Sequence, residues 1–472
     1  MKIHNTLTRQ LDTVTPLTDD TVRIYSCGPT VYDHIHIGNL SSFIYADTLR
    51  RAVEAGEHRV KHVMNFTDVD DKTIRRSREK YADLEPREAL KRLTTEYGDL
   101  FLEDMMAVGN DTDAIEFIKA TDSAVIKGMK QLVTDLHQAG FAYIADDGVY
   151  FSIEAYKKSG KTYGQLTEVS TSSTSEARIQ NDEYDKESAH DFALWKKQKP
   201  GEPAWDFTLD GHELNGRPGW HLECSVMSNQ TLGQPFDIHT GGVDLIFPHH
   251  ENEIAQSTAG QKNPVYASAF VHNEHLLVDG KKMSKSLNNF YTLKDITDKG
   301  FDPLAFRMLV LQSHYRNQAH FSWENLESAQ NRLRDLRALA ALRWQALPVT
   351  HDGATFALEE VPLNLTSLLN DDLRSPQALA FLSDVSTQLQ VVLIETDEIR
   401  HFEAMLRTID ELLGLRLQSV QDITLEQKQL IADREKARTA KDWNKSDKLR
   451  DTLITQGIGL RDTNYGTIWF PL

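Results

Sequence analysis

A strand, a loop, a helix and a second strand follow one another near the start of this chain, and this order constrains the fold most strongly. Residues 21–27, TVRIYSC, are rich in β-branched side chains and run into a Gly-Pro turn, which predicts a strand. Residues 39–56 have helical periodicity and end in glycine, and residues 58–72 predict a second buried strand with an acidic end. Such an order opens a parallel sheet, so we expect an α/β fold.

Length and composition indicate a soluble globular protein of several domains. A chain of 472 residues suggests about three domains at a typical size of roughly 150 residues. Apolar residues make up 40% of the chain and charged residues 26%, which allows an ample core. The first residues show no signal-peptide pattern, and no run approaches the ~20 apolar residues of a membrane helix. We therefore expect a cytoplasmic protein with no membrane partner.

The net charge of −18, taken alone, argues against a nucleic-acid partner, because phosphate contacts need a basic surface. The charge is uneven, however. Residues 331–344, NRLRDLRALAALRW, carry four arginines and one aspartate, and KKMSKS at 281–286 is a compact basic loop. An acidic protein with such segments can still hold a polyanion on a local basic track.

The loop before the first helix has the chemistry of an anion site. His34, His36, Gly38 and Asn39 precede a helix that we expect to begin near Leu40. A helix N-terminus presents free N–H groups to an anion, and glycine lets a large ligand approach the backbone. Imidazole and amide groups can stabilise phosphate oxygens as charge builds in a transition state. The alternative is a histidine-rich turn without a ligand.

A second basic loop, DGKKMSKSLNN at 279–289, follows a predicted strand. Lys282 and Lys285 flank Met283 and Ser284 in it. Two ammonium groups three residues apart suit a triphosphate whose leaving pyrophosphate must be stabilised. The alternative is a solvated basic turn.

The chain has only two cysteines, Cys27 and Cys224, and a structural disulfide is not expected in a reducing compartment. His249 and Glu253 are four residues apart, which places an imidazole and a carboxylate on one helix face. Two thiolates, one imidazole and one carboxylate would make a four-coordinate site suited to zinc. His250 is adjacent, so spacing alone does not choose between the two histidines. Two buried bystander thiols are the alternative.

Two signatures and a series of motifs resemble one protein family. The His-Ile-Gly-Asn loop resembles the HIGH signature of class I aminoacyl-tRNA synthetases, and KMSKS at 282–286 matches the second signature of that class. The other motifs resemble the cysteinyl-tRNA synthetases within this class and stand in that family's order: NTLTRQ, CGPTVYDHIHIGN, NFTDVDDK, DFALWK, GRPGWHLECSVM, FPHHENEIAQS and KMSKSLNN. SHYRNQ, SPQALA and AKDWNKSDKLRD extend the resemblance to the C-terminus.

The resemblance implies a Rossmann-like catalytic domain with a parallel sheet and an inserted connective module. An all-helical domain and a small C-terminal anticodon-binding domain would follow. A Ser/Thr-rich loop at 169–188 and a linker at 347–362 suggest boundaries. The expected parts are two catalytic halves at 1–105 and 191–290, the insert at 106–190, a helical stem-contact region at 291–346, a tRNA-binding bundle at 363–415 and the anticodon-binding domain at 423–472.

The resemblance also implies a reaction in two steps. Cysteine attacks the α-phosphate of ATP, bound with Mg²⁺, and the cysteinyl group of the adenylate then passes to the 3′ end of tRNA(Cys). Positioning and charge stabilisation do most of the work in such a reaction. The implied catalytic residues are His36, Asn39, Lys282 and Lys285. The implied further ATP contacts are His34, Gly38, Ser284 and Ser286. The family's usual form is a monomer.

The family's zinc ligands match Cys27, Cys224, His249 and Glu253. Zinc would select cysteine, because a thiolate is a far better zinc ligand than the serine hydroxyl, whereas an apolar pocket discriminates by only ~1–3 kcal/mol per group. The positions that match the family's cysteine pocket are Thr67, Trp220, His239 and Asp244. The positions that match its anticodon readers are Arg438, Asp447 and Asp462, for which structural salt bridges are the competing explanation. Trp443 and Trp469 could stack on bases or pack.

Three positions depart from the family pattern. Asn39 stands where the class signature has histidine, and it keeps a hydrogen-bond donor. Ser41 stands where the family commonly has arginine, so the contact of that arginine is in question. Asn288 replaces a usual glycine, and asparagine tolerates a left-handed backbone better than most residues.

Two other functions fit parts of the sequence. One is a ligase that joins activated cysteine to an amine-bearing small molecule, which would not need the C-terminal tail. The other is a catalytically idle zinc-containing or RNA-binding paralogue, against which the intact KMSKS sequence and the complete zinc set argue.

Overall fold

Five parallel strands form the central sheet of the protein. The computed structural model describes residues 1–472 apart from 168–190, 262–263, 284–288, 346–356, 390–397 and 464–465. The strand order is β13–β12–β3–β4–β5, and each neighbouring pair is parallel. The bounds are β3 Thr21–Ser26, β4 Arg59–Phe66, β5 Ile115–Lys119, β12 Phe236–Gly242 and β13 Ala267–Asn273. The predicted parallel α/β fold is confirmed, and β3 and β4 lie where the sequence placed its two strands.

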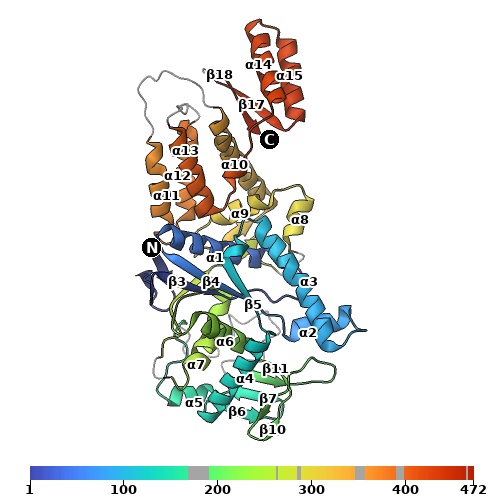
Figure 1. Ribbon diagram of the computed structural model, residues 1–472, viewed down its shortest axis with the longest axis vertical. Coiled ribbons are helices and arrows are strands. Elements are labelled where there is room, and N and C mark those ends of the chain that lie inside the picture. The colour runs from blue at the N-terminus through green and yellow to red at the C-terminus, as the bar shows by residue number, and fades with distance from the viewer. Residues whose placement is uncertain (168–190, 262–263, 284–288, 346–356, 390–397, 464–465) are drawn as a thin grey trace.

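Helices cover both faces of this sheet, because successive side chains of a strand point to opposite sides. Ile24 of β3 packs into the core that includes α1 (Ile37–Ala55), whereas Tyr25 packs into the core that includes α6 (Trp220–Leu232). Figure 1 shows α1 and α6 on opposite sides of β3 and β4. Burial on both faces explains why these strands read as nearly continuous apolar and β-branched runs.

Along the chain, a second, antiparallel sheet comes between strands β5 and β12 of the central one. Its strand order is β11–β8–β7–β6. Helices α2 Asp71–Lys80 and α3 Pro86–Ala107 lie between β4 and β5 of the central sheet. The elements between β5 and β12 are α4 Ser123–Gln138, β6 Ala142–Ala145, β7 Gly148–Phe151, α5 Ile153–Lys158, β8 Phe192–Lys197, β9 Thr208–Leu209, β10 His212–Glu213, β11 Gly216–Pro218 and α6. Trp195, fully buried in β8, anchors its core.

Two expected boundaries cut through these sheets. β5 pairs with β4 in the central sheet, although it lies in the segment 106–190 that was expected to be the insert. β8 and β11 pair with each other in the antiparallel sheet, although they lie beyond residue 190. Pairing joins segments that are distant in the chain, so composition alone does not reveal it. The Ser/Thr-rich stretch 169–188 lies outside the described residues.

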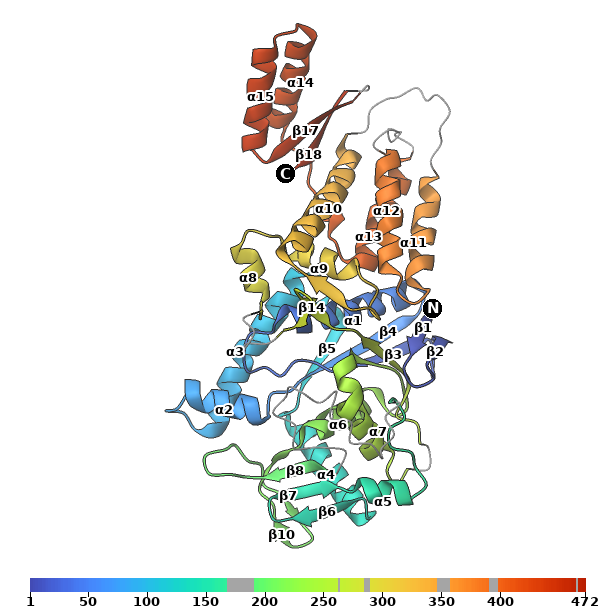
Figure 2. The ribbon, with the colours of Figure 1, turned by 180° about the vertical axis from the view of Figure 1, so that it is seen from behind.

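Helices dominate after residue 291, as the periodicity predicted. The bounds are α8 Leu293–Asp298, α9 Pro303–Leu311, α10 Trp323–Ala341, α11 Val361–Leu369, α12 Ser375–Leu389, α13 Ile399–Leu413, α14 Leu425–Thr439 and α15 Trp443–Thr455. A hairpin of β17 (Ile458–Thr463) and β18 (Gly466–Pro471) completes the chain. Figure 2 shows α11–α13 beyond the α1 side of the sheet and α14–α15 at the far end of the molecule. Helix α11 begins inside the expected linker 347–362, of which 347–356 lies outside the described residues.

The remaining helix and strands are short. They are β1 Lys2–Asn5, β2 Gln10–Thr13, α7 Glu251–Thr258, β14 Leu276–Val278, β15 Lys281–Lys282 and β16 Ala319–Phe321. None of the helices in the described part of the chain combines the length and the hydropathy that crossing a bilayer requires.

The SHYRNQ motif joins three distant segments through one aspartate. Asp372, which lies between α11 and α12 and has a φ of +61°, accepts hydrogen bonds from Tyr315 Oη at 2.6 Å and from the Arg316 guanidinium. It also accepts one from the backbone N–H of His4 at 2.9 Å. These contacts tie β1 and the α9–β16 connection to the helical bundle, so the motif has a structural role.

A buried carboxylate joins the central sheet to the helical bundle. Asp47 of α1 is fully buried and contacts the guanidinium groups of Arg307 at 2.7 Å, Arg51 at 2.7 Å and Arg50 at 3.0 Å. Arg307 of α9 also donates to the carbonyl of Leu413 in α13 at 2.5 Å. Burial alone would raise the pKa of Asp47, but the three guanidinium groups outweigh it and hold this pKa well below its usual range.

We expect Asp47→Asn to lower the free energy of unfolding by about 3–5 kcal/mol, because it leaves buried guanidinium groups without their counter-charge. Urea unfolding at pH 7 measures this difference. The depressed pKa stabilises the folded state above the unfolded-state pKa of about 3.9, so the difference should shrink as the pH falls below that value. The control is Asp298→Asn, which removes an exposed ion pair with Lys294 and should cost under about 1 kcal/mol. An equal loss of unfolding free energy in the two variants would show that Asp47 is not the needed counter-charge of the buried guanidinium groups.

Candidate functional site

The predicted site residues gather at the carboxyl ends of the central strands. Cys27 follows β3, Thr67 follows β4, and His239 lies in β12. In open parallel sheets, ligands bind at this edge where the chain leaves neighbouring strands toward opposite sides. β3 is at such a point, since β4 flanks it on one side and β12 on the other. The topology therefore brings together residues that are distant in the sequence.

Four predicted metal ligands converge here, and we call them the four-ligand cluster: Cys27, Cys224, His249 and Glu253. One donor atom of each lies within 4.8 Å of all the others. The two sulfur atoms are 3.8 Å apart, and His249 Nε2 lies 3.0 Å from Glu253 Oε1. Cys224, His249 and Glu253 are buried, and Cys27 is partly exposed. A second set within the same distance contains Cys27, His239, His250 and Glu253.

The surroundings of the two adjacent histidines differ. His250 Nδ1 shares a hydrogen bond of 2.8 Å with His272 Nε2, and its Nε2 lies 3.4 Å from Cys27 Sγ. His249 Nε2 is buried and lies 3.0 Å from Glu253 Oε1, but within the described part of the chain it makes no hydrogen bond of suitable geometry. The His249 ring is stacked on Trp220 with a centroid distance of 3.9 Å. An imidazole nitrogen that is buried, held in place and not hydrogen-bonded fits a metal ligand, which favours His249 over His250.

The protonation chemistry of the donors also fits a cation. Burial raises the pKa of the Cys224 thiol and lowers the pKa of His249 well below its ordinary value. A metal ligand needs a neutral imidazole, which His249 already is, and a thiolate, which a divalent cation would stabilise.

Tyr266 orients the carboxylate of the cluster. Glu253 Oε2 accepts a hydrogen bond from Tyr266 Oη at 2.9 Å and lies 2.9 Å from His239 Nε2. The other oxygen, Oε1, faces His249 and the two thiols. Tyr266 is itself buried and shares a hydrogen bond with Ser228. Sequence reasoning missed Tyr266, because a lone tyrosine before a strand carries no metal signal.

The four residues of the predicted cysteine pocket differ in how deeply they are buried. Thr67 is buried, and its hydroxyl donates to Glu223 at 2.9 Å. Trp220 is half-buried against His249, and Asp244 is exposed on the turn after β12. His239 is fully buried and lies behind the cluster, against Glu253.

Thr67 is held by residues that the sequence reasoning did not single out. Asn65 Nδ2 donates to the Thr67 hydroxyl at 3.2 Å, and Asn65 Oδ1 accepts from the backbone of Gly28 at 2.8 Å. Glu223 is fully buried, and burial raises its pKa well above its ordinary value. Both lie in motifs that the sequence displayed, NFTDVDDK and GRPGWHLECSVM, but their role depends on distances that only the folded chain supplies.

The predicted ATP loop forms the N-terminus of α1. His36 is the N-cap, and its Nδ1 accepts a hydrogen bond from the backbone N–H of Asn39 at 3.1 Å. A Cβ atom at Gly38 would lie within 2.4 Å of Met283 Cε, so the chain leading into the KMSKS segment lies directly against this loop. Lys282 is exposed at the end of β15, and the His34 ring contacts Tyr97 of α3. Ser284, Lys285 and Ser286 lie outside the described residues.

Ser41, which departs from the family pattern, is a buried residue of α1. Its hydroxyl donates to the carbonyl of Gly38 at 2.7 Å and so supports the first turn of the helix. Asn288, the other doubtful position, lies outside the described residues.

Helices α14 and α15 and the hairpin β17–β18 form the C-terminal unit. Two of the three predicted anticodon residues form an ion pair with each other there. Asp462 forms ion pairs with Arg438 and, at 2.7 Å, with the buried Arg434. Hydrogen bonds from Arg434 hold the pKa of Asp462 well below its usual range. Asp447 is exposed on α15. Arg438 and Asp462 thus form the structural salt bridge that the sequence analysis gave as the alternative to anticodon reading.

The two tryptophans of this unit differ in exposure. Trp469 is buried, and its backbone exchanges hydrogen bonds with the side chain of Gln345. Trp443 is 58% exposed at the start of α15, which leaves its ring accessible.

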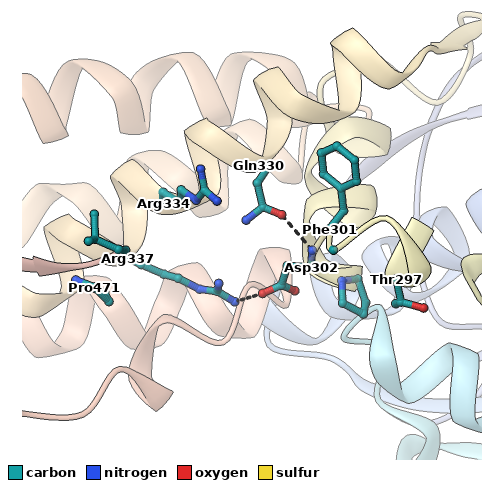
Figure 3. A pocket seen from close by; sticks show the side chains of 10 residues that line it. Thr297, Phe301, Asp302, Gln330, Arg334, Arg337 and Pro471 are labelled. Atoms are coloured by element: carbon teal, nitrogen blue, oxygen red, sulfur yellow. Dashed lines mark hydrogen bonds and ion pairs between the residues drawn. The ribbon is translucent and has the colours of Figure 1, made fainter. Parts of the chain in front are cut away.

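A hollow of about 460 Å³ lies away from the cluster, where the C-terminus meets α10. Figure 3 shows Arg337 of α10 reaching Asp302, with an ion-pair distance of 2.7 Å, and Gln330 accepting from the Asp302 backbone. Pro471 closes the side formed by the C-terminal unit. These contacts position the C-terminal unit relative to α9 and α10.

We expect Tyr266→Phe to weaken zinc binding about 10–100-fold, since partners that orient a metal ligand typically contribute this much. Competition with a chromogenic chelator measures the affinity without any enzyme assay. The matched control is Tyr156→Phe, which deletes another buried hydroxyl that is bonded at 2.8 Å to Thr258 rather than to Glu253. Unchanged affinity in Tyr266→Phe would show that Glu253 needs no such support.

Sequence comparison places these residues in a known family. The chain matches the family described as tRNA synthetases class I (C) catalytic domain over residues 13–331. Cysteine–tRNA ligase of Chlamydia trachomatis is 38% identical over 98% of this chain and 98% of its own length. Cysteine–tRNA ligase of Leptospira interrogans is 38% identical, with 99% of both chains covered.

Solved structures show the same architecture at low identity. Mycobacterium tuberculosis methionyl-tRNA synthetase bound by methionyl-adenylate has a TM-score of 0.59 at 13% identity, covering 85% of this chain and 93% of its own. A LeuRS–tRNA–LeuAMS ternary complex from Agrobacterium radiobacter K84 has a TM-score of 0.61 at 11% identity, covering 86% and 85%. At these identities the likeness concerns the fold alone, and it agrees with a Rossmann-like catalytic domain followed by helices.

Proposed function

The chain belongs to the cysteine–tRNA ligases, a family of class I tRNA synthetases, and we propose that it selects cysteine with a zinc ion held by the four-ligand cluster. It is an ATP-dependent ligase that joins an amino acid to tRNA. The observation that carries the zinc proposal is the convergence of four donor atoms within 4.8 Å, two of them sulfur. This donor set suits zinc rather than magnesium or calcium, which prefer oxygen.

Zinc, when bound, supplies a Lewis acid that takes a thiolate in preference to a hydroxyl. The protein's own residues prepare that choice. Tyr266 and His239 fix one oxygen of Glu253, which leaves the other directed at the cluster. Cys27 is partly exposed, so a substrate thiol can reach the cluster from its side. Pocket shape alone discriminates by only ~1–3 kcal/mol, so a metal-based choice removes the need for a separate editing site.

The remaining pocket residues would position the substrate beside the ATP loop. Trp220 stacks on His249 of the cluster, and His239 contacts Glu253 behind it. Thr67 and Asp244 would complete the pocket. Because Cys27 and His36 belong to one continuous loop, the substrate carboxylate and the α-phosphate would meet over a short distance.

Adenylate formation needs groups that stabilise charge on the phosphates. His36, Asn39 and Gly38 would present the N-terminus of α1 to ATP and its Mg²⁺, with His34 beside them. Lys282 and Lys285 would stabilise the transition state and the leaving pyrophosphate, and Ser284 and Ser286 would add contacts. The proximity of Met283 to Gly38 supports this arrangement, since it brings the two signatures together.

The second substrate is proposed to be tRNA(Cys), which the protein would charge as a cytoplasmic monomer. Asp447, Arg438 and Asp462 would read the anticodon by hydrogen bonds to unstacked bases. Since Arg438 and Asp462 are paired with each other in the free protein, binding would exchange that ion pair for contacts with a base.

We expect purified protein to contain one zinc ion per chain and to catalyse ATP–pyrophosphate exchange that depends on cysteine. Cys224→Ala should lose zinc and at least about 100-fold of the exchange activity, and its remaining preference for cysteine over serine should fall to the ~10–200-fold that a pocket can supply. Elemental analysis and exchange assays measure these quantities, and circular dichroism shows whether the variant is folded. Equal exchange with serine and cysteine in the wild type would overturn the zinc-selection proposal.

Aminoacylation separates the proposal from the small-molecule ligase. We expect tRNA(Cys) to be charged with cysteine and a tRNA with a changed anticodon to be charged at least about tenfold less efficiently, since one lost base contact costs about 1–3 kcal/mol. Charging followed with radiolabelled cysteine measures both rates. Exchange without charging, together with consumption of cysteine in the presence of an amino sugar, would favour the other ligase.

A further inference from the structure

We propose that a basic surface beside the ATP loop binds the unpaired 3′ end of the tRNA and guides it to the adenylate. The proposal rests on the proposed function. The surface, called the α2 surface, consists of residues from α2 and from the connection after β8: Lys72, Arg75, Arg78 and Lys199. Figure 1 shows α2 projecting from the side of the molecule, next to the central sheet.

The α2 surface begins at the ATP loop. Lys72 Nζ lies 5.8 Å from the centroid of the Tyr32 ring, and Tyr32 belongs to the loop that also contains His34. The His34 ring contacts Tyr97 of α3, whose other neighbour is the ammonium group of Lys80 at 4.9 Å from its ring. Lys72 and Lys80 of α2 therefore lie beside Tyr32 of the ATP loop and beside Tyr97, which contacts that loop.

Two segments that are far apart in the sequence build this surface. Asp71, at the start of α2, is paired with Lys196 of β8 at 3.3 Å and with Arg217 of β11. Arg78 reaches the loop after β8, since a Cβ atom at Gly201 would lie 3.2 Å from its guanidinium. These contacts hold the two segments together, and Lys199 lies close enough to Asp71 to help lower its pKa.

The local charge is opposite to that of the whole protein. Residues 71–80, which form α2, and residues 196–199 together contain eight lysines and arginines and two carboxylates, Asp71 and Glu79, in a chain whose net charge is −18. A protein with this charge repels RNA over most of its surface, so a basic track determines where RNA can approach.

Arginine–aromatic pairs border the track, with Arg92 over Tyr81 at 4.9 Å and Arg87 over Trp205 at 5.1 Å. Interleaved basic and aromatic groups are typical of surfaces that bind single strands.

The position selects the 3′ end rather than another part of the tRNA. Aminoacyl transfer requires the terminal adenosine to reach the adenylate at the ATP loop, which adjoins the α2 surface. The unit that carries the predicted anticodon residues lies at the opposite end of the molecule, and Figures 1 and 2 both show α2, α8 and α14–α15 toward the same side. A tRNA bound along this side would have its anticodon at α14–α15 and its acceptor end at α2.

The test combines three substitutions on the α2 surface, Arg75→Ala, Arg78→Ala and Lys199→Ala, in the full-length enzyme. We expect the Kd for tRNA(Cys) to rise at least about tenfold near physiological salt, and log Kd to depend less steeply on log[salt] by about 2. ATP–pyrophosphate exchange needs no tRNA and should stay unchanged, which also shows that the variant is folded. The control removes three exposed lysines from α4 and α5 instead, through Lys127→Ala, Lys157→Ala and Lys158→Ala, and should bind tRNA like the wild type.

A tRNA that lacks its unpaired 3′ nucleotides identifies the bound segment. Its loss of affinity should be large with the wild type and at least fivefold smaller with the α2 variant, because the contacts removed are the same. An α2 variant that binds intact tRNA as tightly as the control variant overturns the proposal. The proposal is also overturned if truncating the tRNA lowers its affinity for the wild type and for the α2 variant by the same factor. That result would assign the α2 surface to another part of the tRNA. Absence of cysteine-dependent exchange in the wild type would instead contradict the proposed function.

Discussion

The close approach of the backbone at Gly28 to strand β4 is the contact on which the rest of the site depends. A Cβ atom at this position would lie 1.7 Å from the carbonyl oxygen of Asn65, so only glycine fits. The Gly28 N–H donates to the Asn65 side chain, and the next residues continue the pairing through Thr30 and Thr67. This contact places Cys27 at the four-ligand cluster and sends the chain onward to the ATP loop. Two sites of different chemistry are thereby built from one strand end.

Hydrogen bonds between buried polar side chains form the floor of the site. Tyr266 and His239 bind one oxygen of Glu253, and His250 is linked through His272 to the hydroxyl of Thr6 at 2.7 Å. An unpaired polar group in such surroundings is costly, so these contacts hold the donors in one geometry before any ligand arrives. The link to Thr6 gives the NTLTRQ motif a structural role beneath the site.

Rigid polar contacts join the catalytic half to the helical half. Arg307 connects Asp47 of α1 to the end of α13, and Asp372 connects β1 to the turn between α11 and α12. Both aspartates are buried and each contacts several donors, so their geometry is specified from more than one direction. The position of helices α9 to α13 relative to the central sheet therefore depends on buried ion pairs.

The sequence by itself determined the α/β class, the first two strands, the family and the four-ligand cluster, because each is carried by local periodicity or by residue types at a short spacing. It also predicted that Cys224 and Glu253 gather near Cys27, as the structure places them, while leaving His249 and His250 open. Only the tertiary structure separated these two, since the distinction lies in hydrogen bonds to His272 and in stacking on Trp220. The same holds for Tyr266, for the pairing of β5 and for the meeting of α2 with the loop after β8. Those relations depend on contacts between segments far apart in the chain, and such contacts exist only when the sheets have brought the segments together.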